Sequence, residues 1–218
     1  MGFKKGFAAV IAAVCVTLTS VSAFAATSPS KAPAAKNYVD TNKKDHSETT
    51  VVSAINTKGT AGTVTKVTTN GGKNHDATVL KVARNASGKA VPITVIGDGK
   101  KGVFASKAGK KVKKVTISSK SKVTVKAYAF KSSKVKKITI SGKVSIKKNA
   151  FKGTGKKNPT IAIKVKKASN VSVAKGAFSG LNSKAKVVVS KSKMSSKEFK
   201  KLTKKLKSAG FKGTIVRK

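Results

Sequence analysis

A short pattern of apolar and polar positions recurs through the second half of the chain. Each copy contains an apolar-x-apolar triplet, a second triplet of the same kind and then the dipeptide Ala-Phe. Three full copies begin at Val115, Ile138 and Ile161, and a fourth begins at Val187 before the pattern changes. These starts are separated by 23, 23 and 26 residues. A repeat of this length predicts a solenoid, in which each coil buries its apolar face against its neighbours.

Each triplet is expected to form a short β-strand with one buried and one exposed face. Alternate side chains of a strand point to opposite faces, so Val115 and Ile117 should point inward and Thr116 outward. The repeat phenylalanines recur after 26, 21 and 27 residues, at Phe104, Phe130, Phe151 and Phe178. Their fixed place in the repeat favours packing in the core over a role as base-stacking platforms.

Less regular β-rich runs precede these copies. Residues 51–55, 64–67 and 79–82 are rich in β-branched side chains and are separated by turn signals that contain glycine. We expect residues 49–90 to form degenerate or capping β repeats and residues 91–190 to form the regular array.

The last segment, residues 191–218, departs from the repeat and predicts a cap. Ser195 or Ser196 can cap the first turn of a helix, and Gly210 is placed to end it. Three apolar residues share one face of this helix: Phe199, Leu202 and Leu206. A short strand is expected over residues 214–216. Such an element covers the apolar end of a solenoid.

The N-terminus has the three parts of a secretory signal peptide. Lys4 and Lys5 precede an apolar stretch over residues 7–21, and a small-x-small site ends at Ala25. We therefore expect residues 1–25 to be cleaved, which places the mature protein outside the cell or on the cell wall.

An uncleaved membrane anchor and a lipoprotein are the rival interpretations of this segment. The apolar stretch is short for a membrane span, and the only cysteine, Cys15, lies in its middle. Cleavage would leave a chain that is held together by packing alone, without a disulfide. Residues 26–48 follow without an apolar period and are expected to form a flexible linker.

The chain is strongly basic, with 49 lysines and arginines, six acidic residues and a formal net charge of +43. Only Arg84 and Arg217 are arginines. Lysine acts as a hydrated point charge, whereas arginine forms the bidentate contacts that recognise bases and phosphates. The composition therefore favours diffuse attraction to polyanions over specific recognition. A surface charged only for solubility is the alternative.

The repeat is expected to align lysines of neighbouring coils into ladders. The first strand places Lys114, Lys137 and Lys186 in one ladder, interrupted by Thr160. Lysines also flank the second strand in two successive coils, where Lys122 pairs with Lys143 and Lys126 with Lys147. Neighbouring strands lie about 4.8 Å apart, and like charges opposite each other destabilise a sheet. These seven lysines are therefore the candidate contacts for a polyanion.

The acidic residues and histidines form no recognisable catalytic or metal site. No two acids occupy corresponding repeat positions, which disfavours a paired-carboxylate hydrolase. The pairs Asp45-His46 and His75-Asp76 lack a third ligand or a nucleophile. Residues 96–102 are glycine-rich but lack the Gly-Lys-Ser/Thr ending of a phosphate-binding loop, so a turn is expected. We predict neither an enzyme nor a cofactor.

Several segments resemble the BspA-like leucine-rich repeats of secreted and surface proteins from Gram-positive bacteria. They are KVKKVTI, KVKKITI, SIKKNAFKG and SVAKGAFSG, together with the lysine-rich tail over residues 177–216. The resemblance is close over residues 90–218 and weak over residues 49–90. Val112 and Val135 stand where leucine is typical, and the third copy has Asn158. The resemblance implies a leucine-rich-repeat solenoid with short helical turns and a C-terminal capping helix.

The same resemblance implies adhesion or protein binding without catalysis. Combined with the charge, it predicts a secreted or surface-associated protein that binds macromolecules and is retained on anionic polymers of the cell envelope or a host. The alternative is an extracellular binder of nucleic acid or of polyanions in general, without sequence specificity. No membrane span is expected after signal cleavage.

Overall fold

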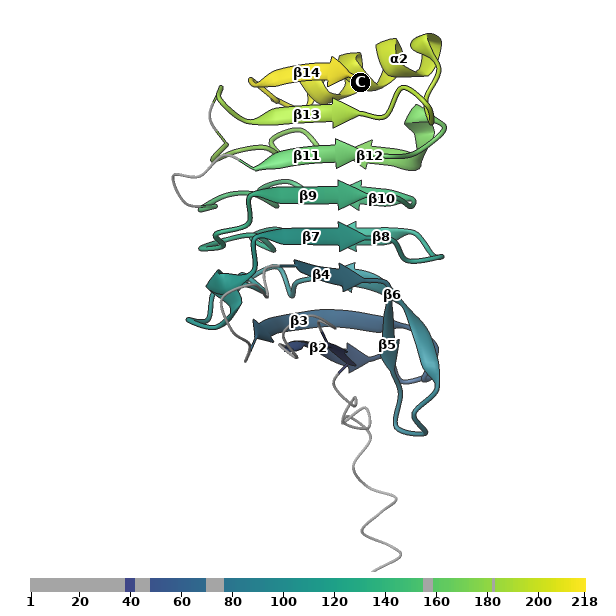
Figure 1. Cartoon of the computed structure of the whole chain (residues 1–218), viewed down its shortest axis with the longest axis vertical. Helices are drawn as coiled ribbons and strands as arrows, with labels where there is room; N and C mark the ends of the chain where they lie inside the picture. Colours follow the sequence, from purple (N-terminus) through teal and green to yellow (C-terminus); the bar gives the residue numbers. More distant parts are fainter. Residues whose placement is uncertain (1–37, 42–47, 70–76, 155–158, 182) are drawn as a thin grey trace, which may run out of the picture. The chain divides into compact units, whose positions relative to one another are not determined.

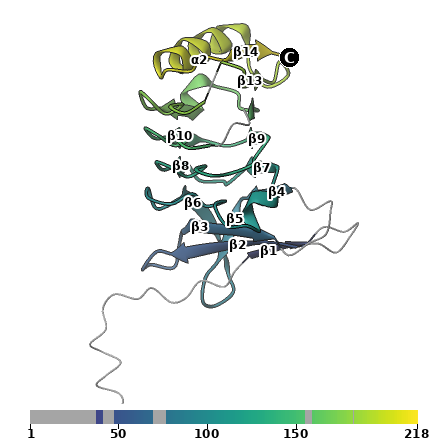
Figure 2. The ribbon, with the colours of Figure 1, turned by 90° about the vertical axis from the view of Figure 1, so that its left-hand side faces the viewer.

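Stacked coils of short strands build two mostly parallel sheets in the computed structural model, which describes residues 38–41, 48–69, 77–154, 159–181 and 183–218 (Figure 1). Sheet I contains β4 (Ala77–Leu80), β7 (Lys114–Ile117), β9 (Lys137–Ile140), β11 (Thr160–Ile163), β13 (Lys186–Val189) and β14 (Thr214–Arg217). Each of the central coils adds one strand to sheet I and one to the second sheet. Figure 2 shows the two sheets side by side along the stack.

Sheet II contains β1 (Tyr38–Thr41), β2 (Glu48–Ile55), β3 (Gly62–Thr69), β6 (Ala90–Ile96), β8 (Val123–Val125), β10 (Val144–Ile146) and β12 (Val171–Val173). A further strand, β5 (Val82–Arg84), pairs with β6. Two short 3₁₀ turns, η1 (Gly109–Lys111) and η2 (Ala168–Asn170), lie between strands. The part of the chain that the structure describes is thus β-rich and solenoid-like, with one α-helix and no closed barrel.

The strand register confirms the predicted alternation of buried and exposed positions. Val115 pairs with Ile138 and Ile117 with Ile140 across β7 and β9, and all four side chains are at most 2% exposed. Thr116 lies on the opposite, half-buried face of the same strand. Because the side chains of a strand alternate between its faces, this register places one apolar column inside the stack and puts Thr116 and Thr139 on the other face.

The repeat phenylalanines form a continuous stack through the core. The ring centroids of Phe104 and Phe130 are 5.5 Å apart, those of Phe130 and Phe151 5.2 Å, and those of Phe151 and Phe178 5.7 Å. A fifth ring, Phe211, meets Phe178 edge-on at 5.1 Å. The predicted core position of the repeat phenylalanines is confirmed, and Phe211 extends the same column into the C-terminal cap.

The residues before the Ala-Phe dipeptides share an unusual backbone conformation. The φ angles of Tyr128, Asn149 and Gly176 are 58°, 61° and 74°. Their amides form a chain between coils, in which Tyr128 donates to the Asn149 carbonyl at 2.9 Å and Asn149 donates to the Gly176 carbonyl at 3.0 Å. This left-handed turn positions each phenylalanine and links the coils outside the sheets.

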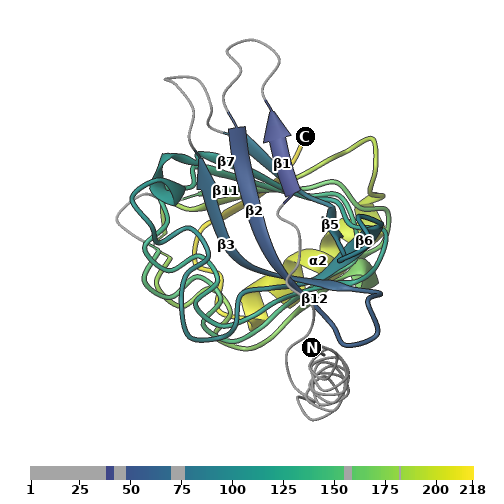
Figure 3. The same cartoon turned by 90° about the horizontal axis from the view of Figure 1, so that it is seen from below.

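The N-terminal strands close one end of the stack as an antiparallel hairpin. β2 and β3 pair antiparallel, and β3 then pairs parallel with β6. Their inward residues Val51, Val64 and Val67 are fully buried. Figure 3 shows β2 and β3 crossing the end of the stack. The capping expected for residues 49–90 is therefore present, but β2 and β3 are hairpin strands and not degenerate repeats.

The array begins earlier than the predicted boundary at residue 91. β4 pairs parallel with β7, with Ala77 opposite Lys114, and so belongs to the first coil. In β6, Ile96 pairs with Val125 and is fully buried. Ile96 and Phe104 are separated by three more residues than Val125 and Phe130, their counterparts in the next coil. This irregular spacing is why the repeat pattern did not reveal the first coil.

The linker expected over residues 26–48 is wrong for its last part. β1 pairs antiparallel with β2, with Tyr38 opposite Val51 and Thr41 opposite Glu48. Main-chain pairing to a neighbouring strand needs no apolar period, so no pattern of apolar residues marks this strand. The signal peptide expected over residues 1–25 lies outside the described residues.

The C-terminal cap is a helix, as predicted. α2 (Ser196–Ser208) begins after Ser195, whose hydroxyl accepts a hydrogen bond from the Glu198 amide. Leu202 and Leu206 are buried against the last coil. The Lys205 ammonium donates to the carbonyl of Ala168 in η2 at 3.1 Å and to that of Val171, the first residue of the edge strand β12, at 3.0 Å. The helix therefore covers an edge that would otherwise be open to pairing with another chain.

One carboxylate of this cap makes its stability depend on pH. The Ala168 amide donates to Glu198 Oε2 at 2.7 Å, and Lys201 Nζ lies 3.1 Å from Oε1. These contacts hold the pKa of Glu198 below its usual value of 4.5. A carboxyl whose pKa is lowered by folding stabilises the fold above its unfolded pKa, and that contribution is lost as the pH falls through the folded pKa.

We therefore expect the urea midpoint to fall as the pH is lowered from 6 to 3, with part of the fall due to Glu198. Urea denaturation of wild type and Glu198→Gln across this range measures that part. The variant should show a flatter profile below about pH 4.5. Identical profiles in both proteins would show that this carboxylate is not coupled to folding.

Candidate functional site

The lysine ladder predicted on sheet I is present in the register of its strands. Lys114 lies opposite Lys137, Thr160 interrupts the column and Lys186 follows it. All three lysines are exposed. The ladder therefore has two adjacent charges and a third that is separated from them by a hydroxyl side chain.

The two ladders predicted beside sheet II are also aligned, each over two coils. The Val123 amide donates to the Lys143 carbonyl at 2.9 Å, which brings Lys122 and Lys143 to the start of adjacent strands. The Lys147 amide donates to the Val125 carbonyl at 3.0 Å, which brings Lys126 and Lys147 to their ends. All four lysines are exposed.

The structure does not bring the seven ladder lysines together on one surface. They lie at the start of sheet I strands, at the start of sheet II strands and at the end of sheet II strands. One of them, Lys143, lines a groove that lies where the chain turns from sheet I to sheet II. We call it the corner groove; its volume is about 630 Å³. It is lined by Ser118, Ser119, Lys120, Ser141, Gly142, Lys143, Lys164, Val165, Lys166, Asn170 and Lys193.

Main-chain hydrogen bonds stack the corners of successive coils to build this groove. The Ser141 amide donates to the Ile117 carbonyl at 2.9 Å, and the Lys164 amide donates to the Ile140 carbonyl at 2.8 Å. A Cβ atom at Gly142 would lie 2.8 Å from the Ser119 carbonyl oxygen. Glycine at this position therefore permits the close approach of two corners.

The corner groove carries charge of a single sign. Five lysines line it, and none of its described lining residues is acidic. The sequence has no carboxylate side chain between Asp98 and Glu198, and Glu198 is engaged by the Ala168 amide and Lys201. Several ammonium groups on neighbouring coils repel one another, and an anion placed among them would relieve that repulsion.

Sequence reasoning missed most of this groove, although the sequence contains a signal for it. Lys120, Lys143 and Lys166 each lie three residues after the last apolar residue of a sheet I strand. The alternation of side chains assigns faces only to residues in strands. It does not place the residues of the corners, because the path of the chain there depends on tertiary packing.

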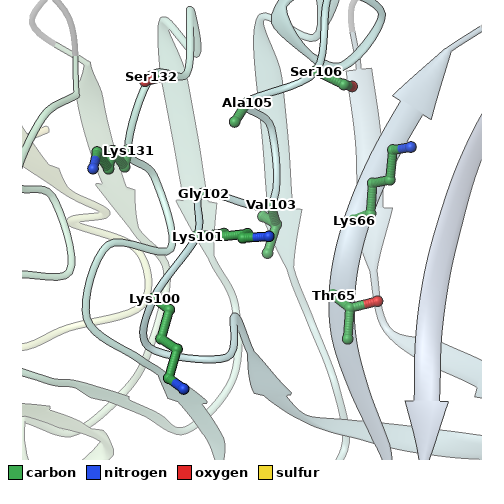
Figure 4. Close-up of a pocket in the computed structure, with 10 residues that line it drawn as sticks. All are labelled: Thr65, Lys66, Lys100, Lys101, Gly102, Val103, Ala105, Ser106, Lys131 and Ser132. Atoms are coloured by element: carbon green, nitrogen blue, oxygen red, sulfur yellow. The ribbon is translucent and has the colours of Figure 1, made fainter.

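A second pocket, of about 360 Å³, lies beside β3 and the turn after β6 (Figure 4). Four lysines are among its lining residues: Lys66, Lys100, Lys101 and Lys131. In Figure 4 the ammonium groups of Lys66, Lys100 and Lys131 point in different directions. These ammonium groups therefore do not point toward one position at which a single anion could bind.

The glycine-rich turn at this pocket is not a phosphate-binding loop. Its Asp98 carboxylate accepts hydrogen bonds from the amides of Lys101 at 2.8 Å and Lys100 at 2.7 Å. These bonds hold the pKa of Asp98 below its usual value of 3.8. Because the protein's own carboxylate takes these amides, they are not offered to a phosphate. The prediction of a turn is confirmed.

Within the described ranges, no group of three histidine, cysteine, aspartate or glutamate side chains could hold a metal ion. The two histidine–aspartate pairs at residues 45–46 and 75–76 lie outside those ranges. No helix among the described residues is long and apolar enough to cross a bilayer.

No protein-family model, curated protein or solved structure matches this chain. The resemblance to BspA-like leucine-rich repeats therefore stays a prediction.

Proposed function

We propose that this chain is a non-enzymatic protein of leucine-rich-repeat type, secreted or held at the cell surface, that binds macromolecules and is retained on anionic polymers. One observation carries the proposal. The stacked coils carry exposed lysines on every turn, while the chain between Asp98 and Glu198 has no acidic residue. A surface of one sign attracts polymers of the opposite sign over a distance set by the salt concentration.

The packing of the coils supports the leucine-rich-repeat part of this proposal. Val112 and Val135, which stand where leucine is typical in the resembling family, are at most 1% exposed. Each lies three residues before the first buried residue of its sheet I strand, so both copies place a buried apolar side chain where the family has leucine. Asn158, in the third copy, lies outside the described residues.

The aromatic residues and arginines favour diffuse attraction over recognition of bases. The repeat phenylalanines are buried in the core and offer no stacking platform. Arg84 donates to the Gly88 carbonyl at 2.9 Å, and Arg217 donates to the Met194 carbonyl at 3.0 Å. Both guanidinium groups thus serve local structure. Sequence-specific binding to nucleic acid normally uses such groups.

Binding of the purified chain to three targets, at low salt and at 0.15 M salt, tests the proposal. The targets are purified cell wall, an extracellular matrix protein and duplex DNA. We expect cell wall or matrix protein to remain bound at 0.15 M, where screening acts over about 8 Å, while DNA binding falls at least tenfold because counterions compete. Loss of all three together at 0.15 M, or no binding at low salt, would contradict the proposal. Retention of DNA alone would support the nucleic-acid alternative.

A further inference from the structure

We infer that the corner groove binds a single extended chain of an anionic glycopolymer, meaning a sugar or polyol chain that carries phosphate, sulfate or carboxylate groups. The inference rests on the proposed function. It names the part of the lysine surface that holds the polymer and the chemical class of that polymer.

The position of the groove fits an extended chain that lies along the stack. Its lining comes from the corners after β7, β9, β11 and β13. Neighbouring strands are about 4.8 Å apart, so four corners span about 14 Å. The volume, about 630 Å³, is in the range of sites for a single small ligand or one chain segment. A linear polymer can therefore contact one corner after another.

The charge of the groove repeats along the same direction. Lys120, Lys143 and Lys166 each lie three residues after the end of a sheet I strand in three successive coils, and Lys164 and Lys193 also line the groove. All five lysines are exposed, so their flexible stems can follow charges at different spacings. A polymer with regularly spaced anionic groups would neutralise several lysines at once, whereas a single small anion would meet only one or two.

The other lining residues favour a hydroxyl-bearing polymer over a nucleic acid. Ser118, Ser141 and Asn170 line the groove beside the lysines. Hydroxyl and amide side chains both donate and accept hydrogen bonds, which suits the hydroxyl groups of a sugar or polyol. The lining includes no aromatic residue, and proteins that bind single-stranded nucleic acid commonly stack its bases on such residues.

Two variants with the same change in net charge test this inference. The groove variant replaces four lysines of the corner groove by glutamine: Lys120→Gln, Lys143→Gln, Lys164→Gln and Lys166→Gln. The control variant replaces four lysines beside the Phe turns of the same coils: Lys134→Gln, Lys148→Gln, Lys152→Gln and Lys175→Gln. All eight side chains are exposed, so neither variant removes a core contact.

Dissociation constants are measured at 0.15 M salt for three probes: a heparin oligosaccharide, a polyglycerol phosphate and a single-stranded oligo-dT. We expect the groove variant to bind at least one of the first two probes at least tenfold more weakly than wild type, and the control variant to stay within threefold. The probe that binds wild type more tightly identifies whether phosphate or sulfated sugar is preferred.

Three outcomes would overturn the inference. Equal weakening in both variants would show that net charge alone binds the polymer, so the proposed function would stand without a groove site. The second is that oligo-dT binds wild type as tightly as the glycopolymers do, and that its binding is weakened to the same extent in the groove variant. The groove would then be a general polyanion site. No binding of wild type to any probe, even at 0.05 M salt, would contradict the proposed function itself.

Discussion

Replacing Phe151 by alanine is expected to lower the free energy of unfolding by about 3–5 kcal/mol. Its ring is 2% exposed and lies between those of Phe130 and Phe178, at centroid distances of 5.2 and 5.7 Å. Truncation leaves a cavity in the middle of the phenylalanine column, and neither neighbouring ring can fill it, because each is fixed by its own coil. Urea denaturation followed by circular dichroism measures the loss.

A neighbouring exposed residue provides the control for this variant. Lys152→Ala changes the next residue, which is exposed, and is expected to alter the free energy of unfolding by less than about 0.5 kcal/mol. Phe151→Leu retains part of the apolar volume and should fall between the two. A loss below about 1 kcal/mol for Phe151→Ala would show that the ring does not belong to the core.

Leu202→Ala is expected to cost about 2–5 kcal/mol, because it removes the buried centre of the capping helix. Leu202 is fully buried, and α2 contacts both η2 and β12. In a solenoid each coil is stabilised mainly by its neighbours, so damage at the cap reaches the last coil first. Hydrogen exchange should therefore become faster in β12 and β13 before it does in β8 and β10.

The control for the cap is Lys204→Ala, on the exposed side of the same helix. Alanine favours helix formation, so this variant should retain the stability of wild type within about 0.5 kcal/mol. If Leu202→Ala speeds hydrogen exchange equally in all coils, the chain unfolds as one cooperative unit and the nearest-neighbour description is wrong. If it has no effect on stability, α2 does not cover the core.

The strands and the phenylalanine column were predictable because both depend on local periodicity. Val115 and Ile117 alternate with Thr116, and this alternation alone assigns their faces once a strand forms. The capping helix was predictable for a similar reason, since Ser195 and Gly210 are local signals for its start and its end. These features need no information about distant parts of the chain.

The N-terminal closure was not predictable in the same way. β2 and β3 have the same β-branched composition as the repeat strands, and composition does not show whether two strands pair parallel or antiparallel. β1 has no apolar period at all, yet its backbone pairs with β2. Both pairings join segments whose partners and direction are visible only in the tertiary structure.

A coil of repeating strands, its phenylalanine core and a strongly basic surface all follow from the sequence pattern. Which lysines share a surface depends on how the coils stack. Lys120, Lys143 and Lys166 are more than twenty residues apart along the chain, and the stacking of three coils brings their corners to one groove. The physical reason is that alternation assigns a residue to a face within its own strand, whereas neighbours across coils are set by register and by the path of each turn.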